Sequence, residues 1–201
     1  MRKDRRNFLM QAGIASGSIV LSPYMPSMAG VGSARQSTKN DAGLPYRQVH
    51  LDFHTSEHIE GIGQRFDAQR FAETLQKASV NSVTCFGRCH HGYIYYDTKR
   101  FPERRHPHLQ PGLHLLNEQI DVCHAHGIRV PVYLTIQWDH YTAMRNPEWL
   151  MRNPEGEPLG PPYFEPGFYR RLCVNSPYRE LIKESIRDLF ESVSRVDGLF
   201  L

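Results

Sequence analysis

The sequence predicts an α/β fold with parallel strands, which we interpret as the N-terminal half of a (β/α)8 TIM barrel that ends in its fourth strand. Apolar strand-like runs alternate with amphipathic stretches from about residue 48 to residue 201, and this alternation indicates parallel strands joined by helical crossovers. The loops after the second and third strands are long, as in barrels whose working face lies at the carboxyl ends of the strands. No glycine-rich phosphate loop follows the first strand, which disfavours the alternative, an open doubly wound sheet.

The first strand is expected at residues 48–55 and the first helix at about 67–79. Asp67 has the side chain of an N-cap, and Phe66 and Phe71 are spaced for a hydrophobic staple across the helix start. The second strand is expected at 82–86, and a long polar and aromatic loop follows it.

A second helix is predicted from about residue 113 to 126, because Leu116, Ile120 and Cys123 share one face and Gly127 stands where a helix ends. Residues 128–136 are nearly continuous in apolar side chains, which is typical of a strand buried on both faces. Ser176 and Pro177 open a third helix. Residues 198–201 begin the fourth strand, so we expect the chain to be the N-terminal part of a longer, incomplete catalytic domain spanning 48–201.

Residues 1–29 resemble a twin-arginine signal peptide: Arg5 and Arg6 precede a short apolar run, and small residues precede Gly30. The apolar run is too short for a stable membrane anchor, which needs about 20 residues. Residues 30–47 are small and polar and are interpreted as a flexible linker. We therefore expect the twin-arginine translocase as a partner during export, and a periplasmic or extracellular location.

The basic charge of the chain lies in this leader. Its four basic residues and Asp4 give the same +3 as the formal net charge of the whole chain, and removing them from 24 basic and 21 acidic residues leaves 20 of each. No basic patch then remains to predict nucleic acid as a partner.

The four cysteines are Cys85, Cys89, Cys123 and Cys173, with no regular spacing. Cys85 and Cys123 fall on apolar faces and are expected in the core. Proteins that use the twin-arginine route generally fold before export in a reducing compartment, so free thiols are expected, although a disulfide is left open.

Polar and aromatic groups follow each of the first three predicted strands. A period of two puts Asp52 and His54 on the same side of the first strand, and the carboxyl ends of parallel strands meet at one face. Three strands that deliver histidines or aromatic rings to one face predict a binding site. The candidate substrate-binding residues are Asp52, His54, His90, His91, Trp138, Asp139 and His140.

The remaining polar residues of these segments are interpreted as solvent-facing. They form two groups: charged residues on one face of the long loop after the second strand, and histidines on loops or helix surfaces. They are Asp97, Lys99, Glu103, Arg104 and Arg105, and His106, His108, His114, His124 and His126.

A metal site is the sharpest alternative, because His50, His54 and His58 have a spacing of four. On a strand and its loop this spacing does not align ligands, and we expect neither a metal nor another cofactor. Histidines with Trp138 and many tyrosines suit a sugar instead, since aromatic faces cover the apolar patches of a pyranose and polar groups bond its hydroxyls. A metal-dependent barrel hydrolase and a non-catalytic carbohydrate-binding barrel both stay open.

The segment "CHHGYIYYDTKRF" resembles the Lys-His-His-(Asp/Glu)-Gly-Phe segment of family 29 alpha-L-fucosidases, and "LDFHT" and "VYLTIQWDHY" are similar to their first and third strand ends. "SPYRELIKESIRDLFESVSRVDGLFL" resembles the helix and strand that lead into their nucleophile. "QWDHYTAMRNPEWLMRNPEGEP" is closer to the barrel glycosidases grouped as hypothetical glycosyl hydrolase family 6. The resemblance spans residues 48–201.

The resemblance implies a retaining glycoside hydrolase in which His54, His90 and His91 contact sugar hydroxyls and Trp138 walls the pocket. It also implies a nucleophile, Asp or Glu, directly after Leu201, with the general acid later still, so that this chain alone is inactive. The chain departs from the fucosidases at Cys89, where they have lysine, and at Gly92, which no acid precedes. These departures leave the sugar open.

Overall fold

The computed structural model describes residues 45–161, 170–193 and 195–201. The expected signal peptide at 1–29 and all but the last three residues of the expected linker lie outside the described residues. Within the described ranges, no helix is long and apolar enough to cross a membrane.

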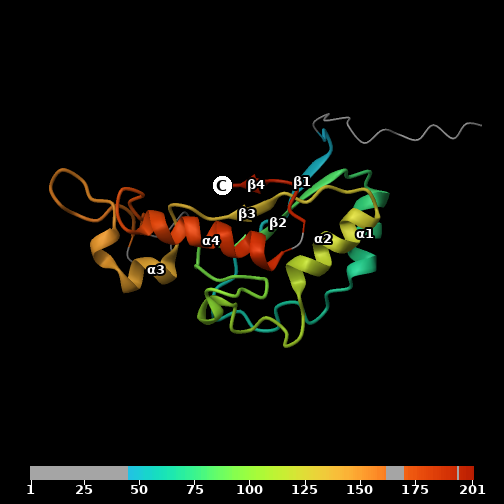
Figure 1. Ribbon diagram of the computed structural model, residues 1–201, viewed down its shortest axis with the longest axis horizontal. Helices are drawn as coiled ribbons and strands as arrows, with labels where there is room; N and C mark the ends of the chain where they lie inside the picture. Colours follow the sequence, from blue (N-terminus) through green and yellow to red (C-terminus); the bar gives the residue numbers. More distant parts are fainter. Residues whose placement is uncertain (1–44, 162–169, 194) are drawn as a thin grey trace, which may run out of the picture. The chain divides into compact units, whose positions relative to one another are not determined.

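Four parallel strands form one sheet in the order in which they occur along the chain (Figure 1). A doubly wound sheet would interrupt this order at a switch point, whereas a barrel adds each strand beside the previous one. The prediction of a half-barrel is confirmed. The strands are β1 (Gln48–His50), β2 (Ser82–Arg88), β3 (Val132–Leu134) and β4 (Leu199–Phe200).

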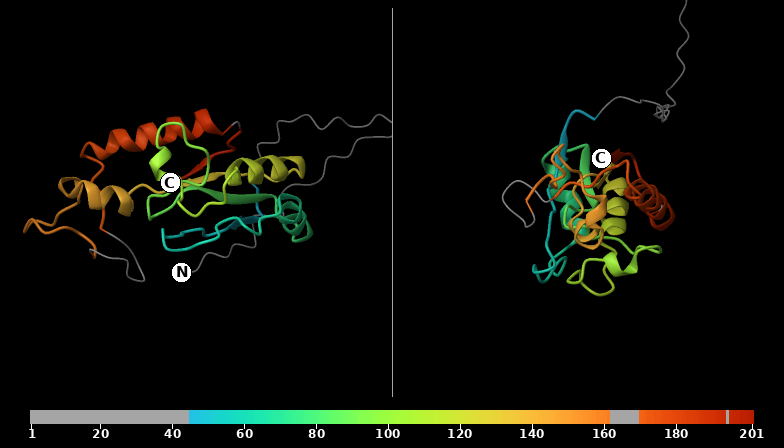
Figure 2. Two further views of the ribbon diagram at one scale, coloured as in Figure 1. Left: turned by 90° about the horizontal axis from the view of Figure 1, so that it is seen from below. Right: turned by 90° about the vertical axis from the view of Figure 1, so that its left-hand side faces the viewer.

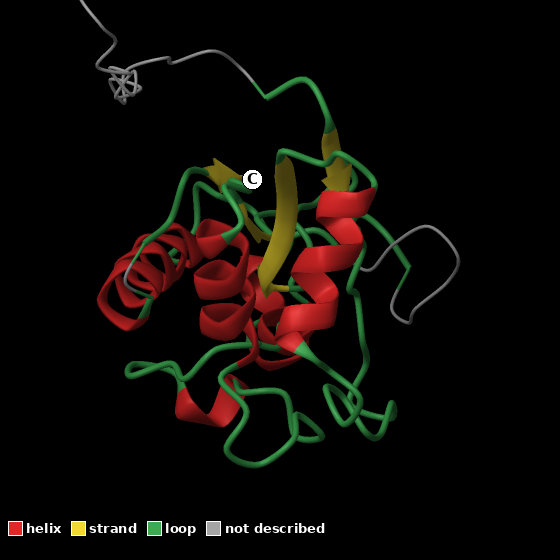
Figure 3. Ribbon diagram, turned by 90° about the vertical axis from the view of Figure 1, so that its right-hand side faces the viewer, coloured by secondary structure: helices red, strands yellow, loops and turns green. Residues whose placement is uncertain are grey.

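The three long helices lie along one face of the curved sheet (Figures 2 and 3). This is the outer layer of a barrel, and the predicted alternation of the four strands with three long helices is confirmed; the short helix α3 was not predicted. The helices are α1 (Ala68–Lys77), α2 (Leu115–Ala125), α3 (His140–Arg145) and α4 (Tyr178–Ser192), with short 3₁₀ turns η2 (Pro102–Arg104) and η3 (Pro147–Trp149).

The predicted N-cap and hydrophobic staple of α1 and the predicted glycine after α2 are also confirmed, although α1 ends at Lys77 and α2 begins at Leu115. Asp67 caps α1 by accepting a hydrogen bond from the Arg70 amide at 2.8 Å, and the rings of Phe66 and Phe71 lie 5.7 Å apart as a staple. Gly127 follows α2 with φ of 71°, a conformation that glycine adopts without strain.

Apolar side chains fill the layer between sheet and helices, where burial supplies the main stabilising free energy. Val83 and Val132 from the strands are fully buried there against Leu116 of α2 and Leu189 of α4. All four cysteines are free, and Cys85, Cys89 and Cys123 are buried. Burial raises the pKa of Cys123 to about 11, so this thiol stays protonated and behaves as a small apolar core group.

Several predicted boundaries and exposures were wrong. The first strand ends at His50 and not at residue 55, and the third is confined to Val132–Leu134. The segments that follow these two strands leave the ladder and contribute to the site described below. Arg104 and His106 are buried, not solvent-facing. His124 is not a plain surface residue either, since its Nε2 lies 2.7 Å from Asp197 Oδ2.

Candidate functional site

Two histidines from different strand ends stack face to face at the carboxyl end of the sheet. The rings of His54 and His90 lie 3.7 Å apart with an angle of 27° between them. The backbone amide of His90 donates to Nδ1 of His54 at 3.0 Å. Because Nδ1 accepts this hydrogen bond, neutral His54 carries its proton on Nε2, which lies 3.8 Å from Asp52 Oδ1.

β3 supplies the other wall of this pair. Tyr133 places its hydroxyl 2.8 Å from Nε2 of His90, and the indole of Trp138 lies 5.4 Å from the His90 ring. The structure therefore brings together four predicted residues, Asp52, His54, His90 and Trp138, from three successive strand ends. This aromatic and imidazole surface can stack on a ring and exchange hydrogen bonds with hydroxyl groups.

His91 is buried, with only 5% of its surface exposed. Its Nδ1 lies 3.8 Å from Cys89 Sγ, and the charge of Glu57 acts to raise its pKa against the effect of burial. His140, at the start of α3, also lies within the electrostatic reach of Glu57 and His91. A second polar group of His91, His140 and Glu57 thus flanks the His54–His90 stack.

Burial makes these histidines weak bases. Burial first, and the neighbouring His54 second, lower the pKa of His90 to about 4 against the opposing influence of Asp52. Burial likewise lowers the pKa of His91 to about 4, against the opposing influence of Glu57, and lowers the pKa of His54 against Asp52. At neutral pH the rings are uncharged and act as hydrogen-bond partners rather than cations.

Gly92 lets the His-His turn pack directly on the start of α3. Its φ is +93°, and a Cβ atom there would lie 2.5 Å from Asp139 Oδ1 and 2.6 Å from Tyr141 Cβ. With no side chain in the way, the amides of His140 and Tyr141 donate to the carbonyls of His90 and His91 at 2.9 and 3.1 Å. The positions of His90 and His91 therefore depend on the N-terminus of α3.

Asp139 is the buried anchor of that N-terminus. It has no exposed surface, and it accepts hydrogen bonds from the amide and hydroxyl of Thr142 at 2.9 and 2.8 Å. Arg104 donates to Asp139 Oδ2 at 3.0 Å, and Arg88 lies 3.6 Å from the same oxygen. Both carboxylate oxygens are occupied by protein groups, so Asp139 orients the site rather than presenting itself to a ligand.

The network continues to α4, which ties the site to the outer layer. Arg88 donates to Ser185 Oγ at 2.9 Å and to the Thr135 carbonyl at 2.8 Å. Asp188 of α4, which is fully buried, accepts from the Tyr96 hydroxyl at 2.9 Å and from the Thr98 hydroxyl at 2.6 Å. The long loop after β2 is thus held by charge-assisted hydrogen bonds over most of its length.

The sequence reasoning missed Tyr133, Arg104 and the positioning role of Arg88. Tyr133 lies in an otherwise apolar run. Its hydroxyl could have indicated a role in the site, because a tyrosine in a buried strand needs a hydrogen-bond partner for that group. Arg104 lies among other charged residues in a polar loop of the sequence. Its burial depends on the contact with Asp139, 35 residues away, which the sequence alone does not show.

Metal ligands do not converge in the described part of the chain: no three His, Cys, Asp or Glu side chains there are placed to hold an ion. His50, one of the three spaced histidines, packs 5.2–6.0 Å from the rings of Phe86, Tyr133 and Phe200. His58 is exposed beside Glu57.

Comparisons with known proteins identify the relatives of this chain. The model of a family described as hypothetical glycosyl hydrolase 6 matches residues 67–201. The chain is similar to alpha-L-fucosidase isoenzyme 2 from Paenibacillus thiaminolyticus, with 39% identity and a TM-score of 0.70 over 79% of this chain and 23% of that one. Thermotoga maritima alpha-fucosidase also matches, with 18% identity and a TM-score of 0.48 over 69% of this chain and 29% of that one. No curated protein matches.

Proposed function

The chain belongs to the hypothetical glycosyl hydrolase 6 family, and from this premise we propose that it forms the substrate-binding half of an exported glycoside hydrolase. The substrate is a glycoside or oligosaccharide. The chain spans 23% of the length of the Paenibacillus alpha-L-fucosidase, so the activity of the complete protein is part of the proposal.

The observation that carries the proposal is the stack of His54 and His90 against Tyr133 and Trp138. Uncharged imidazoles donate and accept hydrogen bonds as sugar hydroxyls do, and an indole offers a flat apolar face. In the proposal Asp52 and His140 complete the polar rim, while His91 and Asp139 hold the loop in place.

The similarity to the Paenibacillus alpha-L-fucosidase supports a narrower form of the proposal, hydrolysis of an alpha-L-fucoside, and the resemblance of the sequence to family 29 supports retention. A retaining mechanism needs two carboxyl groups about 5 Å apart. We propose that the nucleophile is an Asp or Glu directly after Leu201, at the barrel mouth, and that the 201 residues alone bind sugar without hydrolysing it.

The decisive experiment measures 4-nitrophenol release from a panel of 4-nitrophenyl glycosides by the complete protein and by the 201-residue chain. We expect the complete protein to hydrolyse the alpha-L-fucoside and the shorter chain to be inactive. Binding of sugars without hydrolysis by the complete protein would support the non-catalytic barrel. Activity that chelators abolish, and that a divalent metal restores, would support the metal-dependent hydrolase.

Export through the twin-arginine route is part of the proposal and has its own test. Replacing Arg5 and Arg6 together by lysine keeps the charge but removes the recognised pair, so the precursor should accumulate in the cytoplasm. We expect cleavage between Ala29 and Gly30, detected by N-terminal sequencing of the exported protein. Unchanged export of the double variant would refute the twin-arginine assignment.

A further inference from the structure

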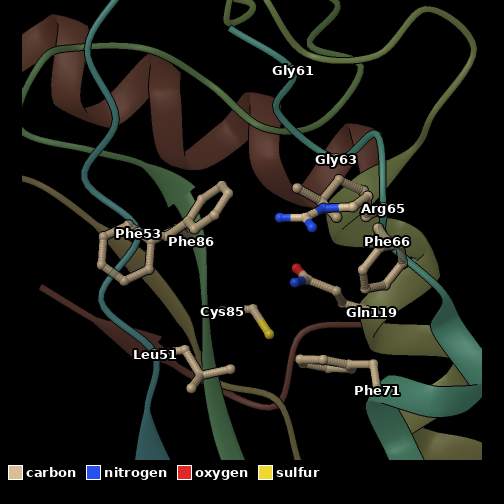
Figure 4. A pocket seen from close by; sticks show the side chains of 11 residues that line it. Leu51, Phe53, Gly61, Gly63, Arg65, Phe66, Phe71, Cys85, Phe86 and Gln119 are labelled. Atoms are coloured by element: carbon tan, nitrogen blue, oxygen red, sulfur yellow. The ribbon is translucent and has the colours of Figure 1, made fainter. Parts of the chain in front are cut away.

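A cavity of about 360 Å³ lies between the segment that follows β1, the C-terminal half of β2, and helices α1 and α2 (Figure 4), and its lining does not include the stacked histidines. It forms because β1 stops pairing with β2 after His50, so the continuing chain arches away from the sheet. Its volume is within the range of small-molecule sites, roughly 300–1000 Å³.

The walls of the cavity are mainly aromatic. Phe53 and Phe86 lie on one side, and Phe66 and Phe71 lie on the other (Figure 4). The first pair belongs to the segment after β1 and to β2, and the second pair is the staple at the start of α1. A flat ring placed between the two pairs would replace water on both of its faces by aromatic side chains.

Two polar side chains point into the space between these walls, the guanidinium of Arg65 and the carboxamide of Gln119 (Figure 4). Neither side chain has a hydrogen-bond partner, nor Arg65 an ion-pair partner, among the residues that the structure describes. Arg65 is exposed and Gln119 is half-buried, so both are accessible to a ligand that enters from solvent. A guanidinium and an amide N–H that line the same cavity are donors that suit a carboxylate.

We propose that this cavity binds a small aromatic monocarboxylate, with its ring between the phenylalanine pairs and its carboxylate on Arg65 and Gln119. The positive charge of Arg65 favours a carboxylate, and the aromatic walls favour a flat apolar ring. A sugar acid has the same carboxylate and a ring of similar size, but its several hydroxyls would find few polar partners in these walls and would lose their water. The cavity lining includes none of the residues that we propose to contact the glycan, although the ring of Phe86 lies 4.9 Å from that of His54. The proposal does not depend on that function.

The test is titration of the 201-residue chain with 3-phenylpropionate, followed by isothermal calorimetry and by ligand-observed NMR. We expect saturable binding with one site per chain. Its neutral analogue, 3-phenylpropionamide, should bind about tenfold or more weakly, because it lacks the charge that Arg65 recognises. Glucuronate is the matched sugar acid and should bind more weakly than 3-phenylpropionate.

Two variants locate the site. Arg65→Gln should weaken 3-phenylpropionate binding by about tenfold or more while leaving binding of the amide nearly unchanged. Arg187→Gln, on the exposed side of α4 and outside the cavity lining, should bind like the wild type. Circular dichroism and melting temperature confirm that both variants fold. No saturable binding, equal affinity for acid and amide, tighter binding of glucuronate, or an unaffected folded Arg65→Gln variant would each overturn the proposal.

Discussion

At the scale of single residues, the buried histidines make the stability of the chain dependent on pH. The pKa of His90 and of His91 is about 4 in the folded protein, below the value of about 6.5 in an unfolded chain. As the pH falls below about 6.5 the unfolded chain therefore binds protons first, and the stability that is complete above this value is lost progressively towards pH 4. We expect the melting temperature to fall between pH 7 and 5.

The pH effect can be assigned to the histidines by substitution. His90→Gln and His91→Gln remove one titrating ring each, so the melting temperature of each variant should depend less on pH between 7 and 5. His114→Gln, on the exposed side of the loop before α2, serves as the control and should keep the full dependence. A melting temperature that stays constant over this range in the wild type would contradict the low pKa values.

The two stacked histidines, His54 and His90, have a separate expected effect on activity. In the complete protein, with the glycoside hydrolase activity that we propose, His54→Ala and His90→Ala should each lower kcat/KM by about 10- to 1000-fold, since each removes one or two hydrogen bonds worth about 1.5–4 kcal/mol together. His114→Ala is again the control, because its ion pair with Asp97 is solvent-exposed and contributes little. Equal losses at all three positions would indicate a general folding defect instead of a lost substrate contact.

At the scale of elements, two aspartates cap helices in very different surroundings. Asp67 caps α1 at the surface, whereas Asp139 caps α3 while it neutralises Arg88 and Arg104 in the interior. Asp139→Asn keeps a good cap but leaves two buried guanidinium groups without their carboxylate, so we expect a loss of about 3–5 kcal/mol in the free energy of unfolding. Asp67→Asn should change it by less than about 0.5 kcal/mol.

Urea unfolding of the two variants measures this difference directly. Similar small losses in both would mean that the buried arginines find other partners and that Asp139 acts as a helix cap alone. A large loss in Asp139→Asn together with an unchanged Asp67→Asn would establish the buried charge network as the support of the His90–His91 turn.

Elements with a strong local pattern were predictable from the sequence, and those formed by distant contacts were not. The helices α1 and α2 could be predicted from local features, namely Asp67, Gly127 and the apolar face of α2, and the structure confirms them. α3 has six residues, too few for an apolar period, and its start is determined by the cap of Asp139 and by carbonyls of the β2 loop. The histidines of the site could be predicted because parallel strands end at one face. Their stacking, and the burial of Arg104, depend on pairings about 35 residues apart in the chain.

At the scale of the whole described domain, the inner face of the sheet carries one ring from each strand. His50, Phe86, Tyr133 and Phe200 contact one another with centroid distances of 4.5–6.0 Å. Barrel interiors are filled by such layers of side chains from neighbouring strands. Tyr133 belongs both to this layer and to the site, so the packing of the layer and the position of His90 are coupled.

The layer is better packed at its centre than at its β4 edge, and this difference can be measured. Phe86 is 3% exposed and Phe200 is 50% exposed. Phe86→Ala should therefore leave a cavity and reduce the free energy of unfolding by about 3–5 kcal/mol, whereas Phe200→Ala should cost about 1 kcal/mol, because half of its ring is already in water. Urea unfolding of both variants of the 201-residue chain tests the expectation. A larger loss for Phe200→Ala would mean that β4 and the other strands share a core that the inner aromatic layer does not explain.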